Sequence, residues 1–237
     1  INRKFYCLLL MYIFFLFIII LAILILINFN FNKELFVNFD NWNSTTKIED
    51  NYLWKNYNIY HAKQNNHGYY KFLPSSYKYP NSKNEINQVI NAMNNRTKYD
   101  EELYFYTDIS IVTLFENILK YYKINEKYNL DKVTKRIIDN ILKYKALHNR
   151  IRPYQLDPDR VIPLMLKNTT GHTPAYPAGH AVQAYYLAKY LSEKHPNIKD
   201  ILFNYAKLID DVRVKAGIHY PSDGKYAYEL VMSKKIN

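Results

Sequence analysis

Apolar residues recur every three to four positions in five stretches of this chain, and this spacing constrains the fold more than any other feature. Such a period places the residues on one face of an α-helix, whereas a half-buried strand alternates apolar and polar residues. No stretch shows convincing strand alternation, so the sequence predicts an all-α helical bundle. The five stripes are Ile86, Val89, Ile90 and Met93; Ile111, Leu114, Phe115, Ile118, Leu119 and Tyr122; Val133, Ile137 and Ile141; Ala181, Ala184, Tyr185, Ala188 and Leu191; and Ile201, Tyr205, Leu208, Ile209 and Val212.

The helical domain is predicted to span residues 81–237. Ser82 and Glu85, ahead of Ile86, have the spacing of a capping box that begins a helix. The faces opposite the apolar stripes carry Lys, Glu and Asp, which favours a water-soluble body over further membrane spans. Residues 28–80 are rich in Asn, Tyr and Lys without sustained periodicity, and they are interpreted as a stalk and an irregular layer over the domain.

An uncharged apolar run from Phe5 to Ile27 precedes the stalk. Its length is sufficient for one transmembrane helix. The run lacks the small residues of a signal-peptide cleavage site, so we expect an uncleaved anchor. Arg3 and Lys4 lie before the run, and the positive-inside rule then predicts a cytoplasmic N-terminus, residues 1–4, with the helical domain across the membrane.

The chain has 32 Lys and Arg against 21 Asp and Glu, a formal net charge of +11 that is spread along the sequence. This charge is compatible with a solvated lysine-rich surface, or with attraction to anionic substrates and membranes. No nucleic-acid-binding motif accompanies it, so nucleic acid is not an expected partner. Cys7 is the only cysteine, which excludes an intrachain disulfide and a cysteine metal cluster.

Two of the apolar stripes end on a cation. Four residues after Ile141 the stripe reaches Lys145, and four after Ile209 it reaches Arg213. A cation on a buried face is costly unless an anion meets it. Either side chain could extend to solvent or pair with an internal acid such as Asp108 or Asp211. The other interpretation is a site for an anionic ligand.

Two segments near these cations combine glycine with histidine. Gly179 and His180 immediately precede the fourth stripe, where a glycine permits close backbone approach and a helix start offers free N–H groups to an anion. His219 is followed four residues later by Asp223, a spacing that allows a carboxylate to fix the imidazole tautomer. Each segment also has a purely structural interpretation, as a turn before a helix or as a local hydrogen bond that closes a loop.

Together these residues resemble the superfamily that joins type 2 phosphatidic acid phosphatases, bacterial non-specific acid phosphatases and vanadium haloperoxidases. The resemblance covers residues 145–223 and consists of three motifs in the family's order. Lys-x6-Arg-Pro is matched by Lys145, Arg152 and Pro153; Pro-Ser-Gly-His by Pro177, Gly179 and His180; and Ser-Arg-x5-His-x3-Asp by Arg213, His219 and Asp223. Ala178 and Val212 replace the two motif serines.

The resemblance implies a role for each matched residue. Lys145, Arg152, Arg213 and the Gly179 N–H would bind the phosphate oxygens, His219 would be the nucleophile oriented by Asp223, and His180 would be the general acid. Ala178 cannot donate the serine's hydrogen bond, which would slow the reaction without removing this machinery. His172, His148 and Arg150 lie close to the motifs, and for each we expect packing or a surface position rather than catalysis, although His172 and Ala178 would also fit a pocket wall.

The implied activity is hydrolysis of phosphoric monoesters through a phosphohistidine, without a metal or other cofactor. Lipid phosphates are slightly favoured over soluble phosphomonoesters because of the predicted anchor. Two alternatives remain open at this point. A vanadium haloperoxidase would hold vanadate in the same pocket, and a catalytically weak or inactive relative would serve in binding or structure. Oligomeric state is not predicted.

Overall fold

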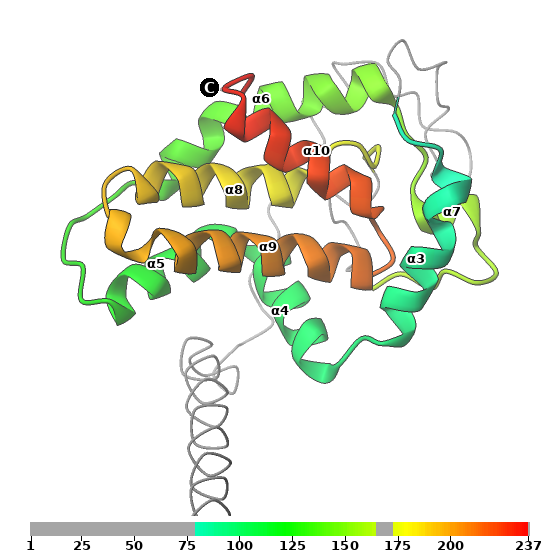
Figure 1. Cartoon of the computed structure of the whole chain (residues 1–237), viewed down its shortest axis with the longest axis horizontal. Helices are drawn as coiled ribbons and strands as arrows, with labels where there is room; N and C mark the ends of the chain where they lie inside the picture. Colours follow the sequence, from blue (N-terminus) through cyan, green and yellow to red (C-terminus); the bar gives the residue numbers. More distant parts are fainter. Residues whose placement is uncertain (1–78, 165–172, 237) are drawn as a thin grey trace, which may run out of the picture.

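The computed structural model describes residues 79–164 and 173–236, and within these ranges the chain is helical and contains no strand (Figure 1). The all-α prediction is therefore confirmed for the described residues. The helices are α3 (Ser82–Asn94), α4 (Lys98–Ile109), α5 (Ile111–Tyr121), α6 (Leu130–His148), α7 (Pro153–Leu156), α8 (Gly179–Ser192), the short 3-10 helix η3 (Pro196–Ile198), α9 (Lys199–Lys215) and α10 (Pro221–Met232).

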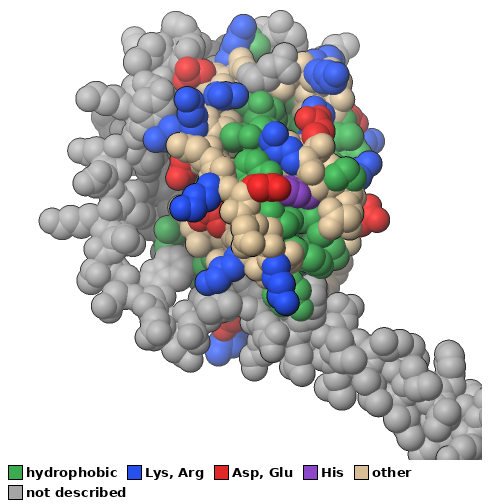
Figure 2. Space-filling model, turned by 90° about the vertical axis from the view of Figure 1, so that its left-hand side faces the viewer, with side chains coloured by type: hydrophobic (Ala, Val, Ile, Leu, Met, Phe, Trp, Pro, Cys, Tyr) green, Lys and Arg blue, Asp and Glu red, His purple; other side chains and the backbone are tan. Residues whose placement is uncertain are grey.

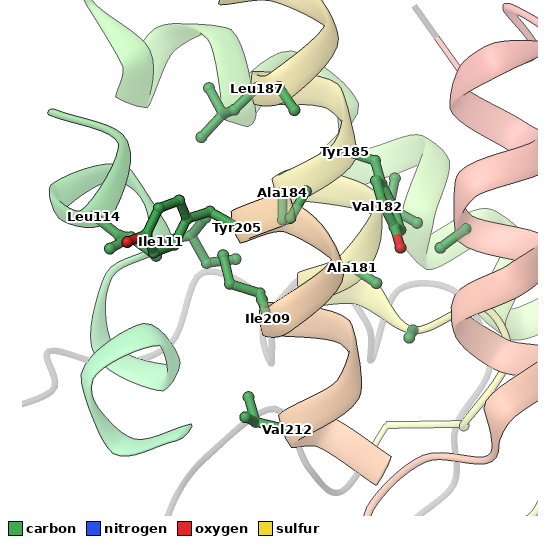
Figure 3. Packing of buried hydrophobic residues seen from close by; sticks show 14 of the residues in the cluster. Ile111, Leu114, Ala181, Val182, Ala184, Tyr185, Leu187, Tyr205, Ile209 and Val212 are labelled. Atoms are coloured by element: carbon green, nitrogen blue, oxygen red, sulfur yellow. The ribbon is translucent and has the colours of Figure 1, made fainter. Parts of the chain in front are cut away.

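Helices α8 and α9 form an antiparallel pair at the centre of the bundle (Figure 1). Helices α6 and α10 pack against α8, while α3 and α4 pack against α9. Ala181, Ala184 and Ala188 of α8 are completely buried, and their small side chains allow α9 to approach closely. Figure 3 shows Tyr205 of α9 directed toward Ile111 and Leu114 of α5. The alanines of the stripe predicted from the sequence are therefore core residues of the central helix pair.

The predicted capping box at the first helix is wrong. Asn81 is the N-cap of α3, and its side chain accepts a hydrogen bond from the Lys83 N–H. Ser82 and Glu85 are instead buried and contact Arg150, far away in the sequence. Tertiary contacts with Arg150, an ion pair from Glu85 and a hydrogen bond to Ser82, therefore replace the local capping box.

Two of the longer helices, α4 and α10, carry no stripe that the sequence analysis recognised. Helix α4 begins at a capping box between Thr97 and Asp100 and buries few apolar side chains among its polar residues. Helix α10 buries Asp223, Gly224 and Ala227 in its first two turns. Both helices face the interior partly through charged or very small residues, which an apolar pattern does not reveal.

The predicted anchor at residues 5–27 and most of the predicted stalk lie outside the described residues. None of the helices described has both the length and the apolar character needed to cross a bilayer. On the face shown in Figure 2, Lys and Arg side chains are scattered among acidic and apolar ones rather than gathered in one patch.

Candidate functional site

The matched motif residues lie at the ends of five helices that converge on one region. Lys145 is in the last turn of α6, Arg152 is the N-cap of α7, and His180 is in the first turn of α8. Arg213 is in the last turn of α9, and Asp223 is in the first turn of α10. Residues far apart in the sequence are thereby brought together in a buried region.

A tight turn joins α9 to α10 and carries His219. Gly217 lies in this turn with φ of +73°, a left-handed conformation that a side chain disfavours. A Cβ atom at this position would also lie 3.1 Å from Val161. The glycine therefore allows the chain to reverse within the few residues that separate Arg213 from His219.

His219 and Asp223 form a buried, oriented pair. Nδ1 of His219 lies 2.9 Å from Oδ2 of Asp223, which also accepts the Tyr220 N–H at 2.8 Å. On the opposite side of the ring, Nε2 of His219 lies 3.0 Å from Nη1 of Arg152. An ionised Asp223 requires the proton on Nδ1, so Nε2 carries the lone pair and faces a cation.

Lys145 and Arg152 provide buried positive charge beside this pair. Lys145 is 4 % exposed, its ammonium donates to the carbonyl of Pro174 at 2.5 Å, and its Cε lies against Gly179. Arg152 donates to the carbonyls of Thr173 and Ile218 at 2.6 and 2.7 Å. The side chains of both cations are therefore held by backbone oxygens and directed into the interior.

Arg213 and His180 share the carboxylate of Asp108 on α4. Nη1 of Arg213 is 3.1 Å from Oδ1 of Asp108, and Nε2 of His180 is 3.5 Å from the same oxygen. Arg213 is fully buried and also contacts the Thr107 hydroxyl. Of the two acids considered from the sequence, Asp108 is thus the partner of Arg213, while Asp211 pairs with Lys207 at the surface.

The charges shift the pKa values of both histidines downward. Burial lowers the pKa of His219 well below its usual value, and the neighbouring Arg152 and Lys145 lower it further. Burial and then Arg213 lower the pKa of His180 in the same way. Lys145 also has a pKa well below its usual value, because of burial and of Arg152. Without an anion, the site therefore disfavours every additional positive charge.

The remaining candidates fall into different places. Ala178 is the N-cap of α8, without a side-chain cap, and its N–H donates to the Asp223 carbonyl at 3.2 Å. Val212 belongs to α9, and its side chain is buried in the core (Figure 3). His148 is buried among tyrosine rings, with Tyr176 at 4.7 Å between centroids. His172 lies outside the described residues.

Two residues of the site, Arg150 and Asp108, have contacts that the sequence analysis did not specify. Arg150, for which packing or a surface position is expected, is completely buried and forms ion pairs with Asp223 and Glu85, each at 2.6 Å. Asp108 joins Arg213 to His180. A buried cation requires an acidic partner, so the sequence indicates that such partners exist. It does not specify which acid pairs with which cation.

Comparison with known proteins adds no further identification: neither a family model nor a curated protein matches this chain.

Proposed function

We propose that this chain is a phosphoric monoester hydrolase that acts through a phosphohistidine, and that it is a divergent relative of the phosphatidic acid phosphatase and haloperoxidase superfamily. One observation carries the proposal. Nε2 of His219 faces Arg152, while Nδ1 contacts Asp223, and the buried cations Lys145 and Arg213 lie close enough to lower the pKa of this histidine.

The charge balance supports an anionic ligand. Lys145 and Arg152 are 4 % and 2 % exposed, and burial lowers the pKa of both. Buried cations are stabilised when an anion compensates them. A phosphate ester would supply that anion, and phosphoryl transfer depends mainly on positioning and on stabilising charge over three oxygens.

In the proposed first step, an oxygen of the bound phosphate accepts the hydrogen bond of the Arg152 N–H. Arg152 thereby leaves Nε2 of His219 free to react. Nε2 then attacks phosphorus in line, so that the Nε2–P bond forms as the P–O ester bond breaks. The leaving alkoxide takes the proton of His180, whose side chain is 15 % exposed, against 2 % for His219. The more open position suits a group that meets a departing alcohol.

The second step uses the same groups in reverse. Neutral His180 accepts a proton from water, the resulting hydroxide attacks phosphorus, and the P–Nε2 bond breaks to release phosphate. A bound dianion would raise the pKa of His180 against the effect of Arg213 and Lys145. Protonation of the acid would thereby accompany substrate binding.

The finer parts of the proposal concern substrate and location. The apolar run at residues 5–27 supports a single-pass anchor with residues 1–4 in the cytoplasm and the helical domain on the other side. Tethering at a bilayer favours lipid phosphates slightly over soluble phosphomonoesters.

Phosphate release tests the activity directly. The full chain in detergent is given para-nitrophenyl phosphate, or phosphatidic acid micelles, in EDTA. We expect release that falls roughly a thousandfold or more in His219→Ala. His195→Ala is the matched control, because this histidine pairs with Glu126 elsewhere on the bundle and should retain activity.

A covalent test accompanies the rate. A radiolabelled phosphoester should leave label on the wild-type chain that is lost in acid and survives alkali, with none on His219→Ala. Equal release by wild type and His219→Ala would overturn the proposal. Bromide oxidation that appears only after vanadate is added, without phosphate release, would replace it with the haloperoxidase.

A further inference from the structure

Arg150 has a side chain whose hydrogen bonds are completely saturated. It lies in the segment between α6 and α7 and is fully buried. Its five N–H groups meet five acceptors, all in α3 and α10 or beside α3: the Ser82 hydroxyl, the Pro80 carbonyl, the Glu85 carboxylate, the Ser222 hydroxyl and the Asp223 carboxylate.

This saturation distinguishes Arg150 from the proposed phosphate ligands. Arg152, two residues later, contacts Nε2 of His219, where a substrate would react. Arg150 contacts the far oxygen of Asp223 and has no N–H left for a substrate. The face of its guanidinium is also covered, because the Tyr220 ring lies 4.0 Å from Cζ.

The contacts form a chain from α3 to the proposed nucleophile. Glu85 accepts from Arg150 at 2.6 Å and from the Ser222 hydroxyl at 2.6 Å. Arg150 donates to Oδ1 of Asp223 at 2.6 Å, and Oδ2 of Asp223 contacts Nδ1 of His219 at 2.9 Å. Glu85, Arg150, Asp223 and His219 are all buried, so displacement of one charged member would leave its partner's charge unpaired.

We infer that Arg150 is a positioning residue for the proposed nucleophile: by bridging Glu85 and Asp223, it holds the carboxylate in the orientation that keeps the proton of His219 on Nδ1 and the lone pair on Nε2. The inference rests on the proposed function of His219. It assigns to Arg150 a role that acts through Asp223 and involves no contact with substrate.

The electrostatics agree with this geometry. Burial raises the pKa of Asp223 to about 6, and Arg150 is the strongest influence in the opposite direction. Removing that cation would raise the pKa further and leave Asp223 protonated near neutral pH. A protonated carboxyl would donate to Nδ1 and move the imidazole proton to Nε2, which would remove the lone pair. The other titratable or charged groups around Asp223 are Glu85, Lys145, Arg152, Tyr176, Asp210, His219 and Tyr220.

Kinetics on the full chain in detergent test the inference. Arg150→Met should lower kcat roughly 10- to 100-fold with KM changed less than about threefold, because only the nucleophile is affected. The pH at the midpoint of the acidic limb of the kcat profile should rise by about one unit or more. Arg150→Lys keeps the charge without the planar fork, so its limb should stay near the wild-type position while kcat remains reduced.

Arg96→Met is the matched control. Arg96 is partly buried, forms one ion pair with Glu101 and donates to one backbone carbonyl, away from His219. It should leave the pH profile unchanged. Circular dichroism verifies folding, and Arg150→Lys remains available if Arg150→Met does not fold.

A spectroscopic measurement separates this inference from the proposed activity. In histidine-labelled chain at pH 7, the nitrogen spectrum should show the Nδ1–H tautomer for His219, assigned by its loss in His219→Ala. The signal should shift toward Nε2–H in Arg150→Met and remain in Arg96→Met. An unchanged tautomer together with an unchanged pH limb in a folded Arg150→Met variant would overturn the inference. Absence of phosphate release by the wild-type chain would overturn the proposed function alone, since the tautomer still tests the positioning role.

Discussion

Ala178 is the residue at which the chain differs most consequentially from the family it resembles. It occupies the N-cap of α8, is completely buried, and makes no side-chain hydrogen bond. Ala178→Ser would supply one donor to a bound phosphate, worth about 1.5–3 kcal/mol for a charge-assisted bond. We therefore expect kcat with para-nitrophenyl phosphate to rise roughly 10- to 150-fold.

The same hydroxyl could instead cap the helix, and the two effects are separable. A serine N-cap stabilises a helix by about 0.5–2 kcal/mol relative to alanine. A higher melting temperature with unchanged kcat would show that the hydroxyl serves α8 and not the substrate. Ala178→Gly, which lacks the hydroxyl, is the control and should not gain activity.

Asp210 provides a pH-dependent prediction at a buried carboxyl outside the proposed chemistry. Burial, followed by the nearby Asp211, raises its pKa from 3.8 to about 7. The contribution of this carboxyl to folding is therefore complete below about pH 3.8 and is lost as pH rises through about 7. Asp210→Asn does not titrate, so its stability relative to wild type should increase between pH 5 and pH 8. Urea unfolding at the two pH values measures this difference.

The exposed neighbour supplies a second test, because Asp211 raises the pKa of Asp210. Asp211→Asn removes that negative charge at a side chain that is 43 % exposed, so the pH dependence of stability at Asp210 should become smaller. If Asp210→Asn and wild type differ equally at pH 5 and pH 8, the Asp210 carboxyl is ionised in the folded chain and the prediction is wrong.

At the scale of elements, Gly224 determines how closely α10 approaches α9. A Cβ atom at this position would lie 1.8 Å from Oδ1 of Asp210. Gly224→Ala should therefore cost about 1–3 kcal/mol or more of unfolding free energy, as overpacking does. Combining it with Asp210→Ala should restore part of that loss, so that the two changes are less than additive in urea unfolding. Additive losses would mean that α10 moves away from α9 as a unit.

The predictable and unpredictable elements differ in what they bury. The sequence predicts α5 because Leu114, Phe115 and Ile118 are completely buried apolar residues at helical spacing. The apolar pattern does not predict α10, because the inner face of this helix begins with Asp223 and Gly224. The motif residues can be recognised in the sequence because the members of each motif lie within a short stretch beside a helix end. The partners of Arg150 cannot, since Glu85 and Asp223 are brought to it only by tertiary packing.

At the scale of the whole molecule, the positive charge has two different distributions. Lys and Arg on the face in Figure 2 are interspersed with acids, so that face does not present one continuous cationic patch to an extended polyanion. Lys145, Arg152 and Arg213 are instead buried at the convergence of α6, α7, α8 and α9. A small anion bound among these three cations would therefore contact several helices at once.

This arrangement predicts that phosphate binding stabilises the folded chain. At one hundred times its dissociation constant, an anion that binds only the folded state raises the unfolding free energy by about 2.7 kcal/mol. Inorganic phosphate should therefore raise the melting temperature of the full chain in detergent, and sodium chloride at equal ionic strength should not. Arg152→Met should abolish the increase, because its guanidinium lies 3.0 Å from Nε2 of His219 in the proposed site, whereas Arg96→Met should retain it. An equal increase with chloride, or one that persists in Arg152→Met, would place the bound anion on the scattered surface cations instead of inside the bundle.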